Sequence, residues 1–374
     1  MTISAYRNSI QTKSQTRKQC RLFWEITSKC ENNCKFCFRL DGTTHLDLSY
    51  QECLKILASY RKFINDYQME SFLIFSGGDP LSREDFFDIL RIAGEYQRSG
   101  IINHITILGN PVHINKKTVC RLKSLADIKY KLSLDGLEAT HDFIRRSGSF
   151  KETLRAIRCL REEEIETAIA FVVSRINAKD LCDVIRLIIS EDIDRFAFST
   201  LTPIGAGKNL ENELLAPQEY RKILMDVLNL LDELPDKYYR LFDGIISNIQ
   251  LFSRLFYELD RWDEYRSIVP TNTNTPAAIS DHGAIFTVLP DGTVYPRRLI
   301  PIKIGRVPQD SFRKIYESSD LLKSLEDAPY TKRKKAATAK CRDCPAVIYC
   351  GQGIACVNHV PGNIYGPHRM CWVE

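Results

Sequence analysis

The stretch Cys30-Glu31-Asn32-Asn33-Cys34-Lys35-Phe36-Cys37, which follows an apolar run at residues 22–26, decides how the rest of the chain is interpreted. Its cysteines have the spacing C-x3-C-x2-C. Cysteines commonly ligate iron–sulfur clusters, and a [4Fe–4S] cluster is normally held by four of them. Three ligands leave one metal position open, which is typical of a catalytic site. The alternative is three shielded thiols or part of a zinc site, although a closed zinc site takes four ligands.

Outward from this triplet, short apolar runs alternate with helical patterns over residues 20–199. Repeated strand–helix units predict an α/β fold with a parallel sheet and helices packed on it. Six such units can curl into a partial (β/α)6 barrel, whose ligands bind at the carboxyl ends of the strands. The expected strands are residues 22–26, 72–75, 104–108, 130–134, 167–173 and 195–199, and the expected helices are residues 49–67, 82–98, 116–125, 149–164 and 178–190.

Two further motifs follow expected strands. In Phe75-Ser76-Gly77-Gly78-Asp79-Pro80, glycine lets the backbone approach a ligand closely, and the acidic side chain can accept from an ammonium group. Ser133-Leu134-Asp135-Gly136 lies at the carboxyl end of the fourth expected strand. Either motif alone is also compatible with an ordinary turn or cap. Together with the cysteine triplet they gather at one rim of the predicted barrel, as expected of a single active site.

A second group of cysteines lies near the end of the chain, where Cys341, Cys344 and Cys350 have the spacing C-x2-C-x5-C and Cys371 follows after 20 residues. Four cysteines can close a site around zinc or around an auxiliary iron–sulfur cluster, and the spacing leaves both open. Before this group, residues 216–268 have a helical pattern. Residues 289–296 predict a hairpin, because Asp-Gly between apolar runs favours a type I′ turn.

The triplet, Gly77-Gly78-Asp79 and the segment at residues 133–136 together resemble the radical S-adenosylmethionine (SAM) enzymes. The resemblance implies that Cys30, Cys34 and Cys37 hold a [4Fe–4S] cluster whose open iron binds the amino and carboxylate groups of SAM. Asp79 stands where the family more often has glutamate, which shortens its reach by one methylene. The residues that the resemblance assigns to SAM are Phe36 near the adenine, Gly77, Gly78 and Asp79 at the amino group, and Asn110, Ser133, Asp135 and Arg145 as further contacts. Residues 202–207 are expected to shape the adenosyl pocket.

Residues 291–371 resemble the SPASM extension of these enzymes, which usually carries two auxiliary [4Fe–4S] clusters. Cys341, Cys344, Cys350 and Cys371 match the ligands of the second of these clusters. A ligand of the first cluster is missing, because relatives often read Tyr-Pro-Cys where this chain has Tyr295-Pro296-Arg297. We therefore expect two [4Fe–4S] clusters in total, one that binds SAM and one auxiliary, with Cys356 as a free thiol or an alternative ligand.

The composition of the 374-residue chain is that of a soluble globular protein, with 44% hydrophobic and 26% charged residues. A net charge of +5 without a recognisable nucleic-acid module makes nucleic acid an improbable partner. The sequence has no membrane span and no signal peptide, so we expect a cytoplasmic protein whose 13 cysteines serve metal sites or are buried rather than paired in disulfides. The expected organisation is a polar segment (1–19), a radical SAM barrel (20–215), a helical linker (216–280) and an auxiliary cluster domain (281–374).

The activity that the resemblance implies is reductive cleavage of SAM to a 5′-deoxyadenosyl radical, which abstracts hydrogen from a substrate. The leading substrate is a ribosomally synthesised precursor peptide that is cross-linked, epimerised or oxidised, with flavodoxin or ferredoxin as the external one-electron donor. The 29 residues before Cys30 are too few for the leader-binding domain of some peptide maturases. The alternatives are modification of a small molecule or porphyrin, sulfatase-type maturation of a partner protein, and a non-catalytic iron–sulfur protein.

Overall fold

The computed structural model describes residues 18–39, 46–234, 246–268, 283–326, 339–344 and 369–373. The chain forms two compact units. One contains Lys18–Leu214 and His282–Glu326, and the other contains Leu215–Asp281 and Asp327–Glu374 together with the N-terminal residues. The domain boundaries expected from the sequence stay a prediction.

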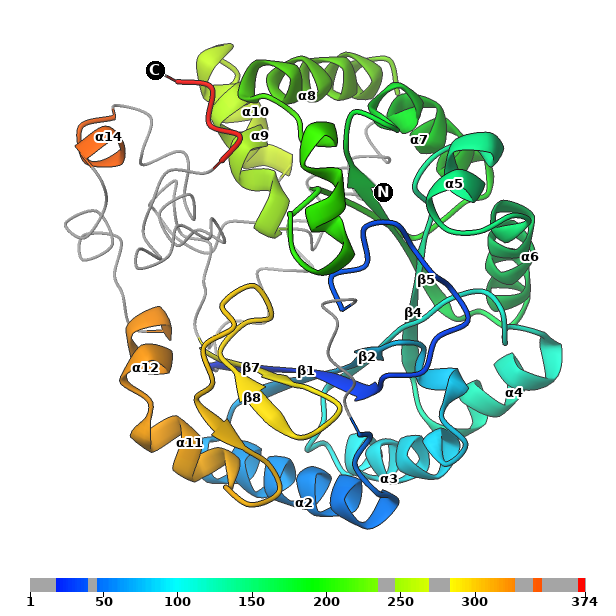
Figure 1. The fold of residues 1–374 in the computed structure, drawn as a ribbon, viewed down its shortest axis with the longest axis vertical. Helices are drawn as coiled ribbons and strands as arrows, with labels where there is room; N and C mark the ends of the chain where they lie inside the picture. Colours follow the sequence, from blue (N-terminus) through cyan, green and yellow to red (C-terminus); the bar gives the residue numbers. More distant parts are fainter. Residues whose placement is uncertain are drawn as a thin grey trace. The chain divides into compact units, whose positions relative to one another are not determined.

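A nine-stranded sheet in the order β6-β5-β4-β3-β2-β1-β7-β8-β9 organises the first unit. The first seven strands in this order are parallel, and β8 and β9 continue the sheet in antiparallel fashion. Figure 1 shows the sheet curving with its helices on the outer side. The predicted α/β partial barrel is therefore confirmed. The strands are β1 (Gln19–Thr27), β2 (Glu70–Gly77), β3 (His104–Leu108), β4 (Ile128–Ser133), β5 (Glu166–Val173), β6 (Arg195–Thr200), β7 (Gly283–Val288), β8 (Thr293–Tyr295) and β9 (Gly305–Arg306).

The helices between the strands lie close to their predicted positions. The helices of the first unit are α2 (Tyr50–Tyr67), α3 (Phe86–Arg98), α4 (Lys116–Leu125), α5 (Glu138–Ile144), α6 (Ser149–Glu162), α7 (Leu181–Ser190), α11 (Phe312–Ser318) and α12 (Asp320–Glu326), with short 3-10 helices η1 (Pro80–Ser82), η2 (Ala178–Asp180) and η3 (Gly205–Glu213). Helix α2 begins at a capping box, in which Ser49 and Glu52 satisfy each other's backbone N–H groups. The prediction did not include α5, and it started α3 four residues too early because η1 precedes that helix.

The sheet has two different faces. Toward the helices, each strand presents large apolar side chains, among them Trp24 and Phe75, which are at most 1% exposed. Burial of such side chains, at roughly 25 cal/mol per Å², is the main force that holds helices to the sheet. The opposite side, called the concave face below, carries the alternate residues. On β4 these are Lys129, Lys131 and Ser133, all of which keep some exposed surface.

The hairpin expected at residues 289–296 forms between β7 and β8, but its turn type was predicted wrongly. A type I′ turn needs a positive φ at both central residues. Only Gly292 has one, at 86°, and its N–H donates to the carbonyl of Leu289. Because this hydrogen bond closes a turn over residues 289–292, the first central residue is Pro290, whose ring fixes a negative φ. The left-handed conformation therefore falls on Gly292, after the two central residues.

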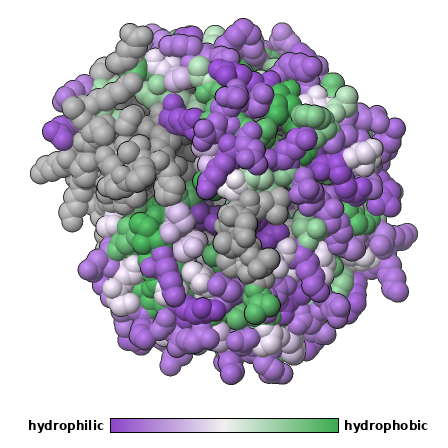
Figure 2. Space-filling view, viewed as in Figure 1, coloured by the Kyte–Doolittle hydropathy of each residue, from purple (hydrophilic) through white to green (hydrophobic). Residues whose placement is uncertain are grey.

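The second unit contains α8 (Pro217–Asp232), α9 (Ile246–Glu258), α10 (Trp262–Ile268) and the short α14 (Ala339–Arg342). These helices confirm the helical pattern expected after residue 216. Among the described residues, no helix is long and apolar enough to cross a bilayer. Figure 2 shows mainly hydrophilic residues on the described surface of the face in view, with hydrophobic residues in separate small patches.

Cysteines outside the two groups were expected to be small buried residues. Cys20 and Cys53 are fully buried, which confirms this expectation for two of them. Cys120 is exposed, and Cys159 and Cys182 are partly exposed, because each lies on the outer part of a helix. For these three the expectation was wrong.

Candidate active site at the carboxyl rim of the sheet

The cysteine triplet lies in the loop after β1, at the carboxyl end of the parallel strands. Backbone hydrogen bonds tie this loop to three other segments. Lys35 N–H donates to the carbonyl of Ile144 at 3.0 Å, Ala206 N–H donates to the carbonyl of Cys37 at 2.9 Å, and Asp79 N–H donates to the carbonyl of Lys29 at 2.8 Å. The loop has no regular secondary structure, so these contacts determine where its thiols lie.

Two of the thiols each have a polar neighbour, Asn110 in the loop after β3 and Arg145 at the end of α5. Asn110 Nδ2 lies 3.7 Å from Cys30 Sγ, and Arg145 Nη1 lies 3.4 Å from Cys34 Sγ. Burial raises the pKa of both thiols, and the Arg145 charge opposes this rise at Cys34. Metal ligation deprotonates a coordinating thiol outright, so an iron cluster would convert these groups to thiolates.

Arg145 is held in place by a buried carboxylate. Asp135 is 0% exposed, and its Oδ2 accepts from Arg145 Nε at 2.6 Å while its Oδ1 accepts from the N–H of Val172 at 2.8 Å. Both carboxylate oxygens are thus bonded within the chain. The structure places Asp135 as the support of Arg145, and direct contact of either residue with SAM stays a prediction.

His141, Ser149 and Asn177 hold this pair in place. The N–H of Asp135 donates to His141 Nδ1 at 3.0 Å, and His141 Nε2 lies 3.1 Å from Ser149 Oγ. Burial lowers the pKa of His141 to about 4, so the ring is neutral near pH 7. Asn177 Nδ2 donates to the carbonyl of Asp135 at 2.9 Å. The contact of Asn177 joins segments 42 residues apart, so no local motif could reveal it, whereas His141 lies only six residues from Asp135.

Gly77 and Gly78 bring the end of β2 against the cysteine loop. A Cβ atom on Gly78 would lie 1.7 Å from the carbonyl oxygen of Lys29, and one on Gly77 would lie 2.4 Å from that of Thr27. Any side chain here would push the loop away. The sequence interpretation expected these glycines to admit a ligand, whereas the close approach in the structure is to the backbone that carries the cysteines.

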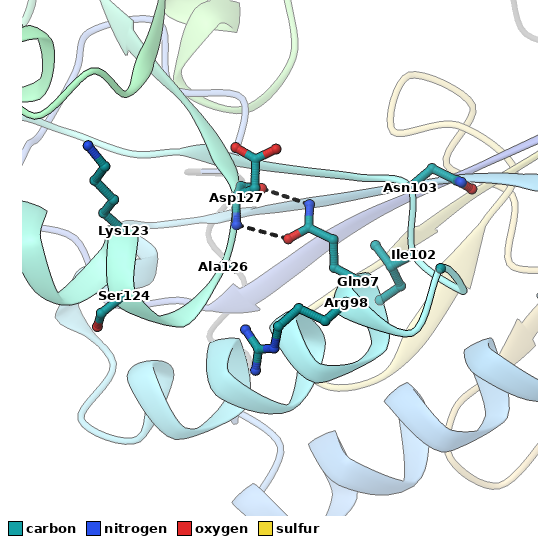
Figure 3. Close-up of a pocket in the computed structure, with 9 residues that line it drawn as sticks. Gln97, Arg98, Ile102, Asn103, Lys123, Ser124, Ala126 and Asp127 are labelled. Carbon is teal, nitrogen blue, oxygen red and sulfur yellow. Dashed lines mark hydrogen bonds between the residues drawn. The ribbon is translucent and has the colours of Figure 1, made fainter.

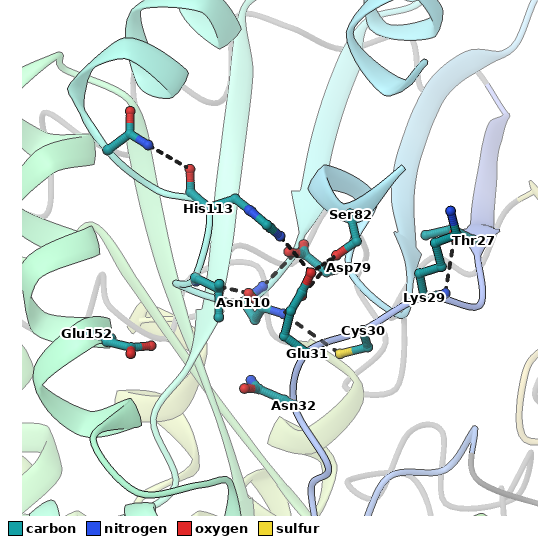
Figure 4. Close-up of polar contacts among 12 residues, drawn as sticks. Thr27, Lys29, Cys30, Glu31, Asn32, Asp79, Ser82, Asn110, His113 and Glu152 are labelled. Atoms are coloured by element: carbon teal, nitrogen blue, oxygen red, sulfur yellow. Dashed lines mark hydrogen bonds and ion pairs between the residues drawn. The ribbon is translucent and has the colours of Figure 1, made fainter. Parts of the chain in front are cut away.

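Asp79 follows the glycines and is 0% exposed (Figure 4). Its Oδ1 lies 3.4 Å from the N–H of Asn110, whereas its Oδ2 is buried without a hydrogen-bond partner in the described part of the chain. Burial, reinforced by the nearby Glu31 carboxylate, raises the pKa of Asp79 to about 7. A buried carboxylate oxygen with no partner is costly and marks a place for a cationic ligand group.

Glu31 and His113 complete a cluster around Asp79, and sequence analysis did not select either. One ligand atom of each lies within 4.8 Å of the others. Burial opposes ionisation of Glu31, but contacts with His113 and Ser82 outweigh it and lower its pKa to about 2. Asn110 Nδ2 lies 3.2 Å from Glu31 Oε2, which explains how the amide is oriented beside Cys30 (Figure 4). The only sequence feature that could have pointed to Glu31 is its position next to Cys30.

The remaining predicted SAM contacts lie in different surroundings. Phe36 is 8% exposed and packs among Ile144, Leu201 and Leu214, with the Arg145 guanidinium 5.4 Å from its ring centre. Ser133 ends β4 on the concave face and is partly exposed. The structure thus brings all eight predicted residues to the rim, while their contact with SAM stays a prediction.

In the second unit, two of the C-terminal cysteines share one arginine. Arg254 on α9 places its Nη1 3.8 Å from Cys344 Sγ and 3.9 Å from Cys371 Sγ. Cys341 lies in α14. Cys350 and Cys356 fall outside the described residues, so the fourth ligand expected at Cys350 stays a prediction. No sequence pattern pointed to Arg254.

A shallow pocket of about 380 Å³ lies at the other end of the strands (Figure 3). Ile102 and Asn103 precede β3, and Ala126 and Asp127 precede β4, so the pocket is at the amino edge of the sheet. Gln97 and Asp127 exchange side chain–backbone hydrogen bonds across it. It therefore plays no part in the site at the carboxyl rim.

Comparison with known proteins agrees with this geometry. A model of the radical SAM superfamily matches residues 24–188, and a model of the SPASM iron–sulfur cluster-binding domain matches residues 282–345. The AdoMet-dependent heme synthase of Methanosarcina barkeri is 24% identical over 88% of this chain and 92% of its own length. The Fe-coproporphyrin III synthase of the same organism is 24% identical over 94% and 87%. The sporulation killing factor maturation protein SkfB of Bacillus subtilis is 20% identical over 80% and 65%.

Two solved structures share the fold. Native anSMEcpe with bound AdoMet aligns with a TM-score of 0.71 at 17% identity and covers 94% of both chains. SuiB from Streptococcus suis bound to its precursor peptide SuiA aligns with a TM-score of 0.63 at 16% identity, over 99% of this chain and 80% of that one.

The two domains imply SAM and two [4Fe–4S] clusters, and the residues at the rim fit SAM and one of these clusters. Three cysteines on one loop can ligate one cluster, and the unpaired Oδ2 of Asp79 suits the ammonium of SAM. The two family matches, together with the cysteine loop at the rim, show that the chain contains a radical SAM domain and a SPASM iron–sulfur cluster-binding domain.

Proposed function

We propose that this protein reductively cleaves SAM at the cysteine rim and uses the resulting radical to abstract hydrogen from a substrate inside the barrel. The observation that carries the proposal is the Cys30–Cys34–Cys37 loop beside the buried Asp79, whose Oδ2 has no hydrogen-bond partner among the described residues. When bound, the reduced cluster and SAM supply the electron and the 5′-deoxyadenosyl group of this chemistry. The chain's own contribution is binding, orientation and exclusion of water.

Individual residues have distinct tasks in this proposal. Cys30, Cys34 and Cys37 hold the cluster, and Asp79 receives the ammonium of SAM. Arg145, fixed by Asp135, donates to Cys34 and keeps the loop in register with β4. Glu31 and Asn110 support the other side of the loop at Cys30.

The direct test is anaerobic incubation of the reconstituted, reduced protein with SAM, followed by quantification of 5′-deoxyadenosine. We expect wild-type protein to form 5′-deoxyadenosine and an Asp79→Asn variant to bind SAM about tenfold more weakly, because a charge-assisted hydrogen bond is lost. Asp88→Asn, on the outer helix α3, is the matched control and should behave as wild type. Absence of 5′-deoxyadenosine from a protein with its full iron content would contradict the proposal.

For the substrate, we propose a ribosomally synthesised precursor peptide. SuiB, which shares the fold, has been solved with its precursor peptide, and SkfB is a maturation protein. Peptides encoded next to the gene are the substrates to test, with mass spectrometry for a loss of hydrogen or a cross-link. A flavodoxin or ferredoxin is the proposed electron donor, to be compared with a chemical reductant in the same assay.

A tetrapyrrole is the second candidate substrate, and one observation favours it. The heme synthase and the Fe-coproporphyrin III synthase match this chain over at least 87% of each length, more than SkfB does. Incubation with Fe-coproporphyrin III under the same conditions would show a change in mass if this candidate is right. Formation of 5′-deoxyadenosine that rises only with one of the two substrates decides between them.

A further inference from the structure

Lys131 lies inside the barrel, below the cysteine rim. It is on β4 between Tyr130 and Leu132, which are 0% exposed and pack toward the helices. Because side chains alternate along a strand, Lys131 is on the concave face together with Ser133. Ser133 ends the strand at the rim, so Lys131 is about 7 Å deeper along β4.

The other charged side chains on this face have partners within the chain. Lys129 Nζ lies 2.9 Å from Glu166 Oε2, and Glu166 also pairs with Arg195. Glu25 on β1 accepts from Arg298 Nε at 2.6 Å. In contrast, no hydrogen bond or ion pair joins the Lys131 ammonium to any residue of the described ranges.

The wall beside Lys131 is made of small residues. Its Cα partner on β5 is Ala168, and two positions further along, Ala170 pairs with Ala197 of β6. The large residues of the same strands, such as Phe171 and Phe196, point to the helices and are buried. Lys131 is therefore flanked by small side chains on β5 and β6, and it keeps partly exposed surface.

An ammonium group in this position calls for an anion. Burial lowers the pKa of Lys131, which shows that water solvates its charge poorly. A desolvated charge without a counter-ion is unfavourable, and a carboxylate would supply both the opposite charge and hydrogen-bond acceptors.

We propose that Lys131 binds a carboxylate of the substrate inside the barrel. This proposal rests on the proposed function, because it assumes that the substrate enters the barrel beneath SAM. The propionates of a coproporphyrin and the acidic or C-terminal groups of a peptide are both carboxylates, so either candidate substrate can supply the group. The carboxylate of SAM itself is the competing occupant, and the experiment must separate the two.

A labelling experiment on the wild-type holoenzyme provides the first test. N-hydroxysuccinimide acetate acetylates accessible amines, and mass spectrometry compares Lys131 with the ion-paired Lys129 as an internal control. The additions are SAM alone, SAM with coproporphyrin III or its tetramethyl ester, and SAM with a peptide encoded next to the gene or its amidated form. We expect at least one free acid, but not its blocked form, to protect Lys131 about tenfold.

Variants provide the second test, with binding of the same probes measured by fluorescence or calorimetry. In Lys131→Met, the dissociation constant of the protecting acid should rise about tenfold and that of its blocked form should not change. Lys129→Met should leave both unchanged, and Lys131→Arg should retain most of the affinity. Because the labelling uses wild-type protein, a folding defect in a variant does not prevent the conclusion.

Protection of Lys131 by SAM alone would overturn the proposal and assign the ammonium to the cofactor. The absence of protection by either free acid, or equal binding of acid and blocked form to wild-type protein, would also overturn it. Formation of 5′-deoxyadenosine is measured separately in the same samples. Its absence from wild-type protein would refute the proposed function, whatever Lys131 binds.

Discussion

An arginine lies beside cysteine sulfur in both units, but the two arginines are held differently. Arg145 donates to Cys34 while its Nε and Nη2 pair at 2.6 Å with the fully buried Asp135. Arg254 lies near both Cys344 and Cys371, and its Nε is 3.8 Å from a carboxylate oxygen of Glu258. The Glu258 carboxylate also accepts from Trp372 Nε1 at 2.8 Å.

The different surroundings of the two arginines reflect different requirements of the two cysteine sites. At the rim, the Arg145 charge is neutralised by Asp135, so its main effect is to fix the position of one cysteine in a loop that must leave an iron open. In the second unit, Arg254 lies beside two thiols, where its charge would offset that of a fully ligated cluster. Net charge and hydrogen bonds to sulfur both tune the potential of an iron–sulfur cluster.

The largest expected effect comes from breaking the rim site. Cys34→Ala should remove the SAM-binding cluster and reduce 5′-deoxyadenosine to the level of cluster-free protein, because the two remaining cysteines cannot hold the cluster. Cys53→Ala, another buried cysteine that lies in α2, is the control and should retain activity. Turnover retained in Cys34→Ala would show that the loop is not the catalytic site.

Breaking the second site should be less severe. Cys371→Ala should lower iron to about one cluster while some SAM cleavage remains, because the auxiliary cluster does not bind SAM. Iron and 5′-deoxyadenosine are measured on the same preparation. If iron does not fall, the C-terminal cysteines hold zinc or no metal.

Replacement of each arginine by methionine compares the two roles directly. Arg145→Met leaves Asp135 buried without its partner and should cost about 3 kcal/mol of unfolding free energy. Arg254→Met should cost about 1 kcal/mol, because Glu258 keeps its bond to Trp372. Urea unfolding followed by tryptophan fluorescence measures both. Equal losses would contradict the different roles assigned to the two arginines.

The pH dependence of stability gives an effect that is small near neutral pH. Because folding lowers the pKa of His141 to about 4, the unfolded chain binds a proton that the folded chain does not once the pH falls below about 6.5. Stability should therefore fall by about 1 kcal/mol between pH 7 and pH 5.5 and should continue to fall toward pH 4. His141→Gln should lack this component. An identical pH slope in wild-type and variant protein would exclude the buried neutral ring.

Much of the fold could be predicted because its strands are apolar runs that alternate with amphipathic helices, and parallel strands bring their carboxyl ends to one rim. The same reasoning predicted that the cysteine loop lies at one rim together with Asp79 and Ser133. It could not reveal that β7 pairs with β1, because the two segments are more than 250 residues apart and no local pattern links them. It also missed α5, a helix of seven residues.

The supporting side chains of the site were predicted least well. Asn177 and Arg254 act through contacts with residues that are distant in sequence, which only the folded chain creates. Gly77 and Gly78 also accommodate the backbone of the cysteine loop, which the sequence did not indicate, and their predicted approach to SAM stays a prediction. A sequence motif marks residues that carry chemistry, but it says little of the residues that hold them in place.

The most direct test of the central claim is the iron and sulfide content of anaerobically reconstituted protein, with Mössbauer spectra to identify the cluster type. The account predicts about eight irons per chain, all in [4Fe–4S] form, with one iron of the rim cluster changing its signal when SAM is added. About four irons with one zinc would contradict it, because the C-terminal cysteines would then form a structural site.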